Sequence, residues 1–354
     1  MPTMKDVAKA ARVSLATVSA TLSGAAYVSP ELRRRVLEAV DALGYAPNSV
    51  ASGLKRGKTS LLGLIVPDIT NPFFTELVHH VQLAARGAGY SVLLGVSDQD
   101  VVREGELLRL MRSHQAAGTI LCGTGAAGDY ETLSRDVGQM RLVMVDNAPA
   151  GIGVDTIVLD NGEAAALATR HILSFGHRLV ATVAGPEHQV PGRERLEGFL
   201  ATMAAESLAA PADLVRRGAF RQEDAFDAGC ELLSLHSRPT AIFVANNHML
   251  VGVMQAVAAA GLSVPRDISV AGIDDFPWAI AFTPTLTTVR QPIAAMAETA
   301  LTRLMARIGG ERGEPQRQVM APELIVRNSC APPARDARSD LEADARRIDF
   351  PLQR

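Results

Sequence analysis

The chain has 354 residues, of which 47% are hydrophobic, which allows several folded domains and excludes a mainly disordered chain. Its net charge is −3, and its three cysteines lack CxxC spacing, which argues against a disulfide framework or a cysteine zinc site. No run of about 18 apolar residues could cross a membrane and no secretory signal is present, so we expect a cytoplasmic protein without metal or cofactor.

Charge is distributed unevenly along the chain. Residues 1–60 hold nine basic and four acidic residues, so this segment carries +5 and the remainder −8. A basic head on an acidic body favours a polyanionic partner for the head alone. The alternative is a solvated basic surface with no binding role.

Three short helices are predicted before residue 46. Residues 3–6 (Thr-Met-Lys-Asp) form a capping box for the first helix, and Arg12-Val13 breaks it. Ser14 caps the second helix, Ser29-Pro30 starts the third, and Gly44 ends it. Apolar residues at helical spacing predict the core: Val7, Ala8, Ala11, Val18, Leu22, Leu32, Val36, Val40 and Leu43.

Three short helices with a tight first turn predict a helix-turn-helix unit, whose second helix enters the DNA major groove. The outward side chains of this helix are hydroxyls suited to phosphates and small or apolar groups that can contact a thymine methyl. The hydroxyl set is Ser14, Thr17 and Ser19, and the apolar set is Leu15, Ala16 and Ala20. The alternative is a three-helix bundle that binds protein.

A fourth, shorter helix is predicted after a turn at residues 45–48. Asn48 can cap it, and it ends near Arg56. A helix of about eight residues is unstable alone, so it needs a partner. A second copy and a DNA minor groove would supply one, with Leu54 as a wedge between base steps. The DNA-contacting set here is Asn48, Ala51, Leu54 and Lys55, and the alternative is a simple linker.

From Leu61 onward, apolar strands alternate with helical stretches, which predicts an α/β fold of two lobes with parallel sheets. Ligands of such folds bind in the crevice at the carboxyl ends of the strands. Polar and aromatic residues follow these strands or lie in nearby loops, and they would suit a polyhydroxylated ligand. These candidates are Phe73, Phe74, Asp146, Asp160, Arg195, Phe220, Asn246 and Asp274. The alternative for the Asp and Asn residues is helix capping.

The pattern VSxATVS followed by GYxPNxxAxxL resembles the LacI/GalR family of repressors, and the resemblance extends to about Asn328. It implies that residues 4–45 are the DNA-binding headpiece and 48–56 a hinge helix whose Leu54 inserts at the operator centre. It also implies that Arg195, in the segment RERLEGF, binds the effector and that Phe220 stacks on it. The segments FVAN and GIDD resemble further effector-contacting elements.

Three positions depart from the family pattern. Arg12 stands where the family usually has Gly, and it costs roughly 1 kcal/mol if that turn is left-handed. Ala20 replaces a residue that often hydrogen-bonds a base, which weakens direct readout. Asn247 stands where many members have Asp.

The sequence thus predicts a homodimeric transcriptional regulator, most simply a repressor, that binds a pseudo-palindromic operator in double-stranded DNA. Its effector should be a carbohydrate, a sugar or sugar acid, bound between the lobes. The first alternative is control by a partner protein, and a less favoured one is an α/β sugar-binding enzyme. The expected domains are 1–47 headpiece, 48–59 hinge and linker, and 60–330 sensor, followed by a disordered tail, 331–354. Within the sensor, lobe 1 takes about 60–160 and 291–319, and lobe 2 takes about 161–290 and 320–330.

One motif points elsewhere. Residues 123–128 match GxGxxG after a strand, and Asp146 follows 18 residues later, as in dinucleotide-binding folds. That fingerprint belongs on the first strand of its fold, whereas two strands precede it here. With 29 glycines in the chain, we interpret the match as chance.

Overall fold

The computed structural model describes residues 2–23, 27–45, 59–130 and 140–334. The chain divides into two compact units, Met1–Ser60 and Leu61–Arg354. The predicted hinge helix, with Asn48, Ala51, Leu54 and Lys55, lies outside the described residues, as does the tail from residue 335. Among the residues described, no helix is both long and apolar enough to cross a bilayer.

Unit 1 contains three helices, as predicted: α1 (Met4–Ala11), α2 (Leu15–Ser23) and α3 (Pro30–Leu43). The capping box is formed, because the Thr3 backbone N–H donates to Asp6 Oδ2 at 2.7 Å and the Asp6 N–H donates to Thr3 Oγ1. Ser14 caps α2 by accepting from the Thr17 N–H at 3.1 Å. Gly44 ends α3 in the left-handed conformation, with φ of 57°.

The core of unit 1 differs from the prediction in two places. Val7, Val18 and Val36 are fully buried, but Leu43 is exposed and Ala39 is buried instead. Leu43 is the last residue of α3, and Val40 before it and Tyr45 after it pack against the core instead. Ser29 precedes α3 as expected, yet its side chain makes no capping hydrogen bond.

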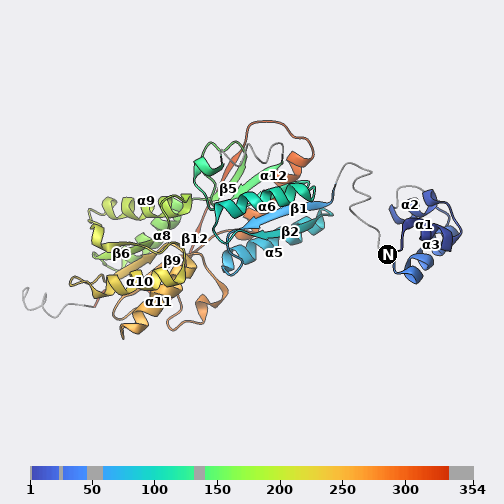
Figure 1. Ribbon diagram of the computed structural model, residues 1–354. Coiled ribbons are helices and arrows are strands. Elements are labelled where there is room, and N and C mark those ends of the chain that lie inside the picture. The colour runs from blue at the N-terminus through green and yellow to red at the C-terminus, as the bar shows by residue number, and fades with distance from the viewer. Residues whose placement is uncertain (1, 24–26, 46–58, 131–139, 335–354) are drawn as a thin grey trace, which may run out of the picture. The chain divides into compact units, whose positions relative to one another are not determined.

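The first of the two sheets of unit 2 has six strands in the order β11-β5-β4-β3-β1-β2. Helices α5 and α12 pack together on one face, and α6 covers the other (Figure 1). The strands are β1 (Leu61–Val66), β2 (Ser91–Val96), β3 (Gly118–Leu121), β4 (Leu142–Val145), β5 (Asp155–Leu159) and β11 (Arg317–Met320). The helices are α5 (Pro72–Gly87), α6 (Val101–Ser113) and α12 (Ile293–Ile308). We call this sheet and its helices lobe 1.

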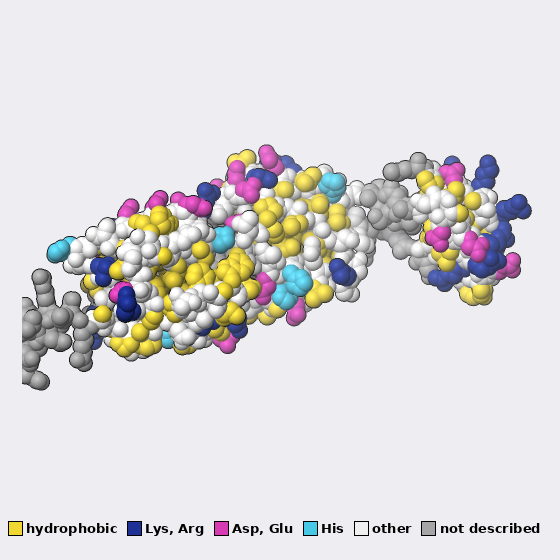
Figure 2. Space-filling view, turned by 90° about the horizontal axis from the view of Figure 1, so that it is seen from below, with side chains coloured by type: hydrophobic (Ala, Val, Ile, Leu, Met, Phe, Trp, Pro, Cys, Tyr) yellow, Lys and Arg dark blue, Asp and Glu magenta, His cyan; other side chains and the backbone are white. Residues whose placement is uncertain are grey.

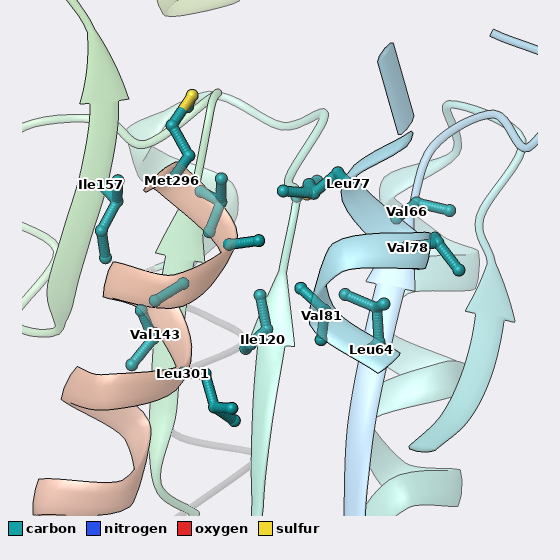
Figure 3. Close-up of a cluster of buried hydrophobic side chains, with 14 of the residues drawn as sticks. Leu64, Val66, Leu77, Val78, Val81, Ile120, Val143, Ile157, Met296 and Leu301 are labelled. Atoms are coloured by element: carbon teal, nitrogen blue, oxygen red, sulfur yellow. The ribbon is translucent and has the colours of Figure 1, made fainter. Parts of the chain in front are cut away.

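The core of lobe 1 shows why these sequences form parallel strands. Strand residues such as Leu64 and Ile120 point at α5 and α12 (Figure 3). Leu77 of α5 and Leu301 of α12 belong to the same buried cluster. Ile65, on the opposite face of β1, packs under α6 instead. Strands with both faces buried read as continuous apolar runs, which is the pattern seen in the sequence.

Lobe 2 repeats this design with a sheet in the order β12-β10-β9-β8-β6-β7. Helices α8 and α9 cover one face, and α10 and α11 cover the other (Figure 1). The strands are β6 (Val180–Ala184), β7 (Val215–Arg217), β8 (Ala241–Val244), β9 (Ser269–Ile273), β10 (Thr287–Arg290) and β12 (Glu323–Ile325). The helices are α8 (Asn161–Ser174), α9 (Val190–Ala205), α10 (Gln222–Ser234) and α11 (Asn247–Ala259), with 3₁₀ turns at Ala212–Leu214 and Pro277–Ile280.

The predicted fold class is confirmed, and the apolar runs after Leu61 form strands β1 to β6, β8 and β9. Four strands escaped the prediction: β7, β10, β11 and β12. They have three or four residues each and several polar side chains, so they lack the long apolar run of the central strands. One pairing also departs from a parallel sheet, because β12 runs antiparallel to β10.

The chain crosses between the lobes in three places: between β5 and α8, between β10 and α12, and between β11 and β12. These crossings join the two sheets without a long linker. They also place the carboxyl ends of both sets of parallel strands beside the same crevice, which is where the candidate site lies.

Candidate functional site

Two aspartates occupy equivalent positions at the ends of strands in the two lobes. Asp146 directly follows β4 and Asp274 directly follows β9. Both are in the left-handed region, with φ of 68° and 70°. Each backbone N–H donates to the adjacent strand, Asp146 to Ile157 O at 3.0 Å and Asp274 to Val289 O at 2.9 Å. The sheets therefore hold both residues in a conformation that a Cβ-bearing residue rarely adopts.

Arg195 is the charged centre of the site. It lies on α9 and is only 2% exposed. Its Nε donates to Asn161 Oδ1 at 2.8 Å and its Nη1 donates to Ala245 O at 2.7 Å. Nη1 also lies 3.6 Å from Asp274 Oδ2. A guanidinium with several fixed partners is held in one orientation before any ligand arrives.

The two aspartates differ in their partners. Asp274 accepts a 2.5 Å hydrogen bond from Gln291 Nε2, in addition to its ion pair with Arg195. Within the described residues, the Asp146 carboxylate accepts no hydrogen bond. Burial raises the pKa of Asp146 to about 7, the nearby Arg195 lowers it, and the charge of Asp274 raises it further. The carboxyl of Asp146 therefore changes charge near neutral pH.

These groups line a pocket between the two lobes, with an empty volume of about 510 Å³ that includes some open solvent. Phe73 and Phe74 begin α5 with their rings edge to face at 4.9 Å. The Phe220 ring lies 5.9 Å from Arg195 Cζ. The full lining is Pro67, Asp68, Asn71, Phe73, Phe74, Gln99, Gly123, Thr124, Asp146, Gln189, Pro191, Arg195, Phe220, Asn246, Asp274 and Gln291.

The position of Phe220 depends on glycine. Ala219 and Phe220 both have positive φ, 48° and 58°, so the loop after β7 turns sharply toward the pocket. The ring packs against Gly185, where an added Cβ would lie 2.3 Å from Phe220 Cζ. Gly185 follows β6, and its lack of a side chain leaves room for the aromatic ring.

The structure brings seven of the eight sequence-predicted pocket residues together, namely Phe73, Phe74, Asp146, Arg195, Phe220, Asn246 and Asp274. Asp160 is not among them. Its Oδ1 caps α8 by accepting from the Glu163 N–H at 2.9 Å, and it lines a separate surface depression. Helix capping was the alternative for this residue, and its neighbour Asn161 makes the contact with Arg195 instead.

Sequence reasoning missed several polar lining residues, including Asp68, Asn71, Gln99, Thr124 and Gln291. Asp68 and Gln99 lie in the loops that follow β1 and β2, so the strand-end rule applied evenly could have found them. Gln291 had no such signal, because β10 was not predicted. Its Oε1 is buried without a hydrogen-bond partner among the described residues.

Asn247 makes a contact between the lobes. Its Nδ2 donates to Asn71 Oδ1 at 2.9 Å, and its own Oδ1 accepts from the His248 N–H. Asn71 Oδ1 also caps α5 by accepting from the Phe73 N–H. A carboxylate at position 247 could not donate to Asn71, so the amide gives this chain an uncharged bridge.

Three consecutive N–H groups of the GxGxxG segment are taken up by side chains of the protein. The Thr124 N–H donates to Glu104 Oε1 at 2.6 Å, the Gly125 N–H to Tyr130 Oη at 2.8 Å, and the Ala126 N–H to Asp129 Oδ2 at 2.8 Å. Glu104 is fully buried, and burial raises its pKa. A dinucleotide phosphate would have to compete with these side chains for the three donors.

The predicted DNA-reading helix α2 exposes part of its predicted set. Leu15 is 42% exposed, and Ser14, Ala16 and Ser19 are also exposed. Thr17 and Ala20 are half-buried, and the Thr17 hydroxyl bonds that of Ser14 at 2.8 Å. Lys and Arg side chains gather along unit 1 in Figure 2, as the charge count predicts.

Comparisons with known proteins match both units. A model described as bacterial regulatory proteins, lacI family, matches residues 3–48, and one described as a periplasmic binding protein-like domain matches residues 169–330. The ribose operon repressor of Escherichia coli is 36% identical over 93% of this chain and 100% of its own length. The HTH-type transcriptional repressor PurR of Photobacterium profundum is 33% identical over 93% of this chain and 98% of its own.

Solved structures give the same picture. The Lac repressor dimer bound to operator and the anti-inducer ONPF superimposes with a TM-score of 0.84 at 26% identity, covering 93% of this chain and 99% of that one. The transcriptional regulator CelR in complex with cellobiose has a TM-score of 0.71 at 30% identity, covering 93% and 100%.

Proposed function

This chain belongs to the LacI family of bacterial regulatory proteins, and we propose that it is a repressor whose operator affinity is set by an uncharged sugar in the pocket between its lobes. The protein binds operator DNA as a dimer and responds to a small molecule, as its relatives do. The identity of that molecule and the residues that hold it are the new part of the proposal. The DNA-contacting set on α2, and the hinge set at residues 48–55, belong to the proposal as well.

The observation that carries the proposal is the arrangement of Arg195 between Asp146 and Asp274. Neighbouring hydroxyl groups of a sugar ring can each donate to a carboxylate while accepting from a guanidinium. Phe220 and the Phe73–Phe74 pair supply apolar faces for the C–H side of the ring. A specific small-molecule pocket requires a small number of polar groups in fixed orientations, together with aromatic walls.

Charge favours an uncharged sugar over a sugar acid. The pocket lining contains Asp68, Asp146 and Asp274 but Arg195 as its single cationic residue among the described ones, and Arg195 is already paired with Asp274. Gln291 Oε1 adds a further acceptor without a partner. An acceptor-rich site with net negative charge attracts ligands that donate hydrogen bonds and disfavours anions.

Several finer points go with this proposal. Relatives are named as repressors, so we propose that the pocket binds its ligand without turning it over, in a cytoplasmic protein. The proposed domain bounds are 1–47, 48–59 and 60–330, as the sequence suggests. Coupling requires that the sugar bind one arrangement of the lobes more tightly than another, because only a differential affinity can shift an equilibrium.

Thermal melting of the full-length protein tests the ligand class. The panel pairs neutral sugars with anionic derivatives of the same ring: D-ribose with D-ribose 5-phosphate, and D-glucose with D-gluconate. We expect at least one neutral sugar to raise the Tm and titrate by calorimetry, with its anionic partner weaker by tenfold or more. An anion that binds tighter than its neutral partner would overturn the charge argument. A panel of sugars without any effect, with purine bases stabilising instead, would overturn the sugar assignment.

A further inference from the structure

The turn between α1 and α2 contains a residue in an unfavourable conformation. Arg12 has φ of 53° and ψ of 49°, which is the left-handed region that residues with a Cβ rarely adopt. Glycine adopts this region freely. A chain that keeps arginine here therefore carries a conformational cost that glycine would remove.

The backbone around Arg12 is fixed from several sides. The Val13 N–H donates to Ala8 O at 3.0 Å, closing the end of α1. From α3, Arg35 Nη2 donates to Ala11 O at 2.6 Å and lies 3.2 Å from Arg12 O. These contacts hold the turn, and none of them uses the side chain of Arg12. The stability of the turn thus gives no reason for arginine at this position.

The Arg12 side chain is exposed and makes no hydrogen bond or ion pair with any described residue. Two neighbouring arginines of unit 1 are engaged: Arg34 pairs with Glu38 at 2.8 Å, and Arg35 bonds the turn. Arg12 is an uncommitted guanidinium on a rigid backbone, two residues before Ser14, the cap of α2.

We propose that Arg12 contacts a phosphate of the operator backbone. This inference rests on the DNA-binding function given above. In a helix-turn-helix unit the amino end of the second helix enters the major groove, so residues just before that end lie beside the phosphates bordering the groove. Guanidinium pairs with phosphate through its positive charge and its N–H donors, and lysine retains the charge and a donor. The conformational cost at residue 12 persists because the contact with DNA offsets it.

The experiment uses the full-length protein and an operator selected by the wild type from a random duplex library. Three variants separate strain from charge. Arg12→Gly removes both, Arg12→Gln keeps the strained backbone but removes the charge, and Arg12→Lys keeps both strain and charge. The control is Arg238→Gln, which removes one exposed charge from the loop before β8 in unit 2. Operator affinity is measured from 50 to 200 mM salt, and native-state hydrogen exchange of α1 and α2 reports headpiece stability.

We expect Arg12→Gly and Arg12→Gln to weaken operator binding and to flatten its salt dependence. Arg12→Lys and Arg238→Gln should keep most of the operator affinity and of its salt dependence. One phosphate contact contributes a slope of about 0.9 in log affinity against log salt, so two headpieces per dimer contribute about 2. The ratio of wild-type affinity to Arg12→Gln affinity for the operator should therefore fall roughly tenfold between 50 and 200 mM salt. Arg12→Gly should at the same time exchange more slowly than wild type in α1 and α2.

Opposite signs for stability and affinity in Arg12→Gly are the result that a purely structural role does not give. Unchanged salt slopes in Arg12→Gly and Arg12→Gln would overturn the phosphate contact. Faster exchange in Arg12→Gly would overturn the claim that the arginine is strained. If the wild type itself selects no operator and binds duplex DNA with no salt dependence, the DNA-binding function fails, which is a separate result.

Discussion

The two lobes share a strand order, yet they hold equivalent carboxylates in different states. Asp146 follows the third strand from one edge of its sheet, and Asp274 follows the corresponding strand in lobe 2, both with positive φ. Asp274 is bonded by Gln291 and paired with Arg195, whereas Asp146 accepts no hydrogen bond among the described residues. The topology places both carboxylates, and each one meets different neighbours.

This difference suggests a division of labour between the lobes. Lobe 2 supplies a polar framework whose partners are already in place, namely Arg195 with Asn161, Ala245 and Asp274. Lobe 1 supplies Asp146, whose carboxylate accepts no hydrogen bond from the described residues, and under the proposed function a ligand hydroxyl would donate to it. A ligand that donates to Asp146 while bonding Arg195 would link the lobes and favour one arrangement of them.

Loss of Arg195 should have the largest effect, because it removes the single cationic side chain of the pocket lining described here. Arg195→Ala leaves the buried Asp274 and the half-buried Asp146 without a countercharge. We expect a loss of about 3–5 kcal/mol in the free energy of unfolding at pH 8, measured by urea denaturation. The matched control is Arg193→Ala, an exposed arginine on the same helix, which should cost under about 0.5 kcal/mol. Equal losses in both variants would contradict the assigned role.

The two variants Asp146→Asn and Asp274→Asn compare the lobes most directly, through their effects on the free energy of unfolding. The pKa of Asp146 is raised to about 7, so the folded protein favours the protonated carboxyl. Stability from this group is therefore full at acidic pH and is lost as pH rises from its usual pKa toward 7. Asp146→Asn should stabilise the protein at pH 8 by roughly 2–4 kcal/mol, with little effect at pH 5.

Asp274→Asn should act in the opposite direction, because it removes an ion-pair partner of Arg195. We expect a loss of about 1–3 kcal/mol. Melting curves of both variants at pH 5 and pH 8 check the pair. The same sign for both variants at pH 8 would mean that the two carboxylates are equivalent after all.

A smaller effect is expected at Gly185 of lobe 2, which leaves space for the Phe220 ring. Gly185→Ala would place a Cβ 2.3 Å from Phe220 Cζ and 3.0 Å from Gly192 Cα, so the ring has to move. We expect a loss of about 1–3 kcal/mol and weaker sugar binding. Gly176→Ser, at a left-handed turn with open space, is the control for stability alone. Full sugar affinity in Gly185→Ala would show that the ring position does not matter.

How much the sequence could reveal depended on the kind of signal. Long apolar strands and helix caps such as Thr3 and Ser14 follow from local rules, so they were predicted well. The strand-end rule found Asp146 and Asp274 for the same reason. Asp160 also follows a strand, but its side chain turns to cap α8, a choice that depends on the backbone at that point.

Residues that act through distant partners had no local signal. Gln291 reaches the site because it directly follows β10, which pairs in parallel with β9. The strand β10 is too short to be detected by its sequence pattern. Glu104 satisfies a glycine-rich loop 20 residues away, which no spacing rule anticipates. At Arg12, in contrast, the family's usual glycine had raised the condition of a left-handed turn, and the structure meets that condition.

The central claim is that a sugar in the pocket changes operator affinity through Arg195. The most direct test measures operator affinity with and without the neutral sugar that gives the largest rise in Tm, for wild type and Arg195→Ala. We predict a change of at least tenfold for wild type, no change for Arg195→Ala, and similar ligand-free affinities for both. A wild-type protein that binds the sugar but holds its operator with unchanged affinity would contradict the account.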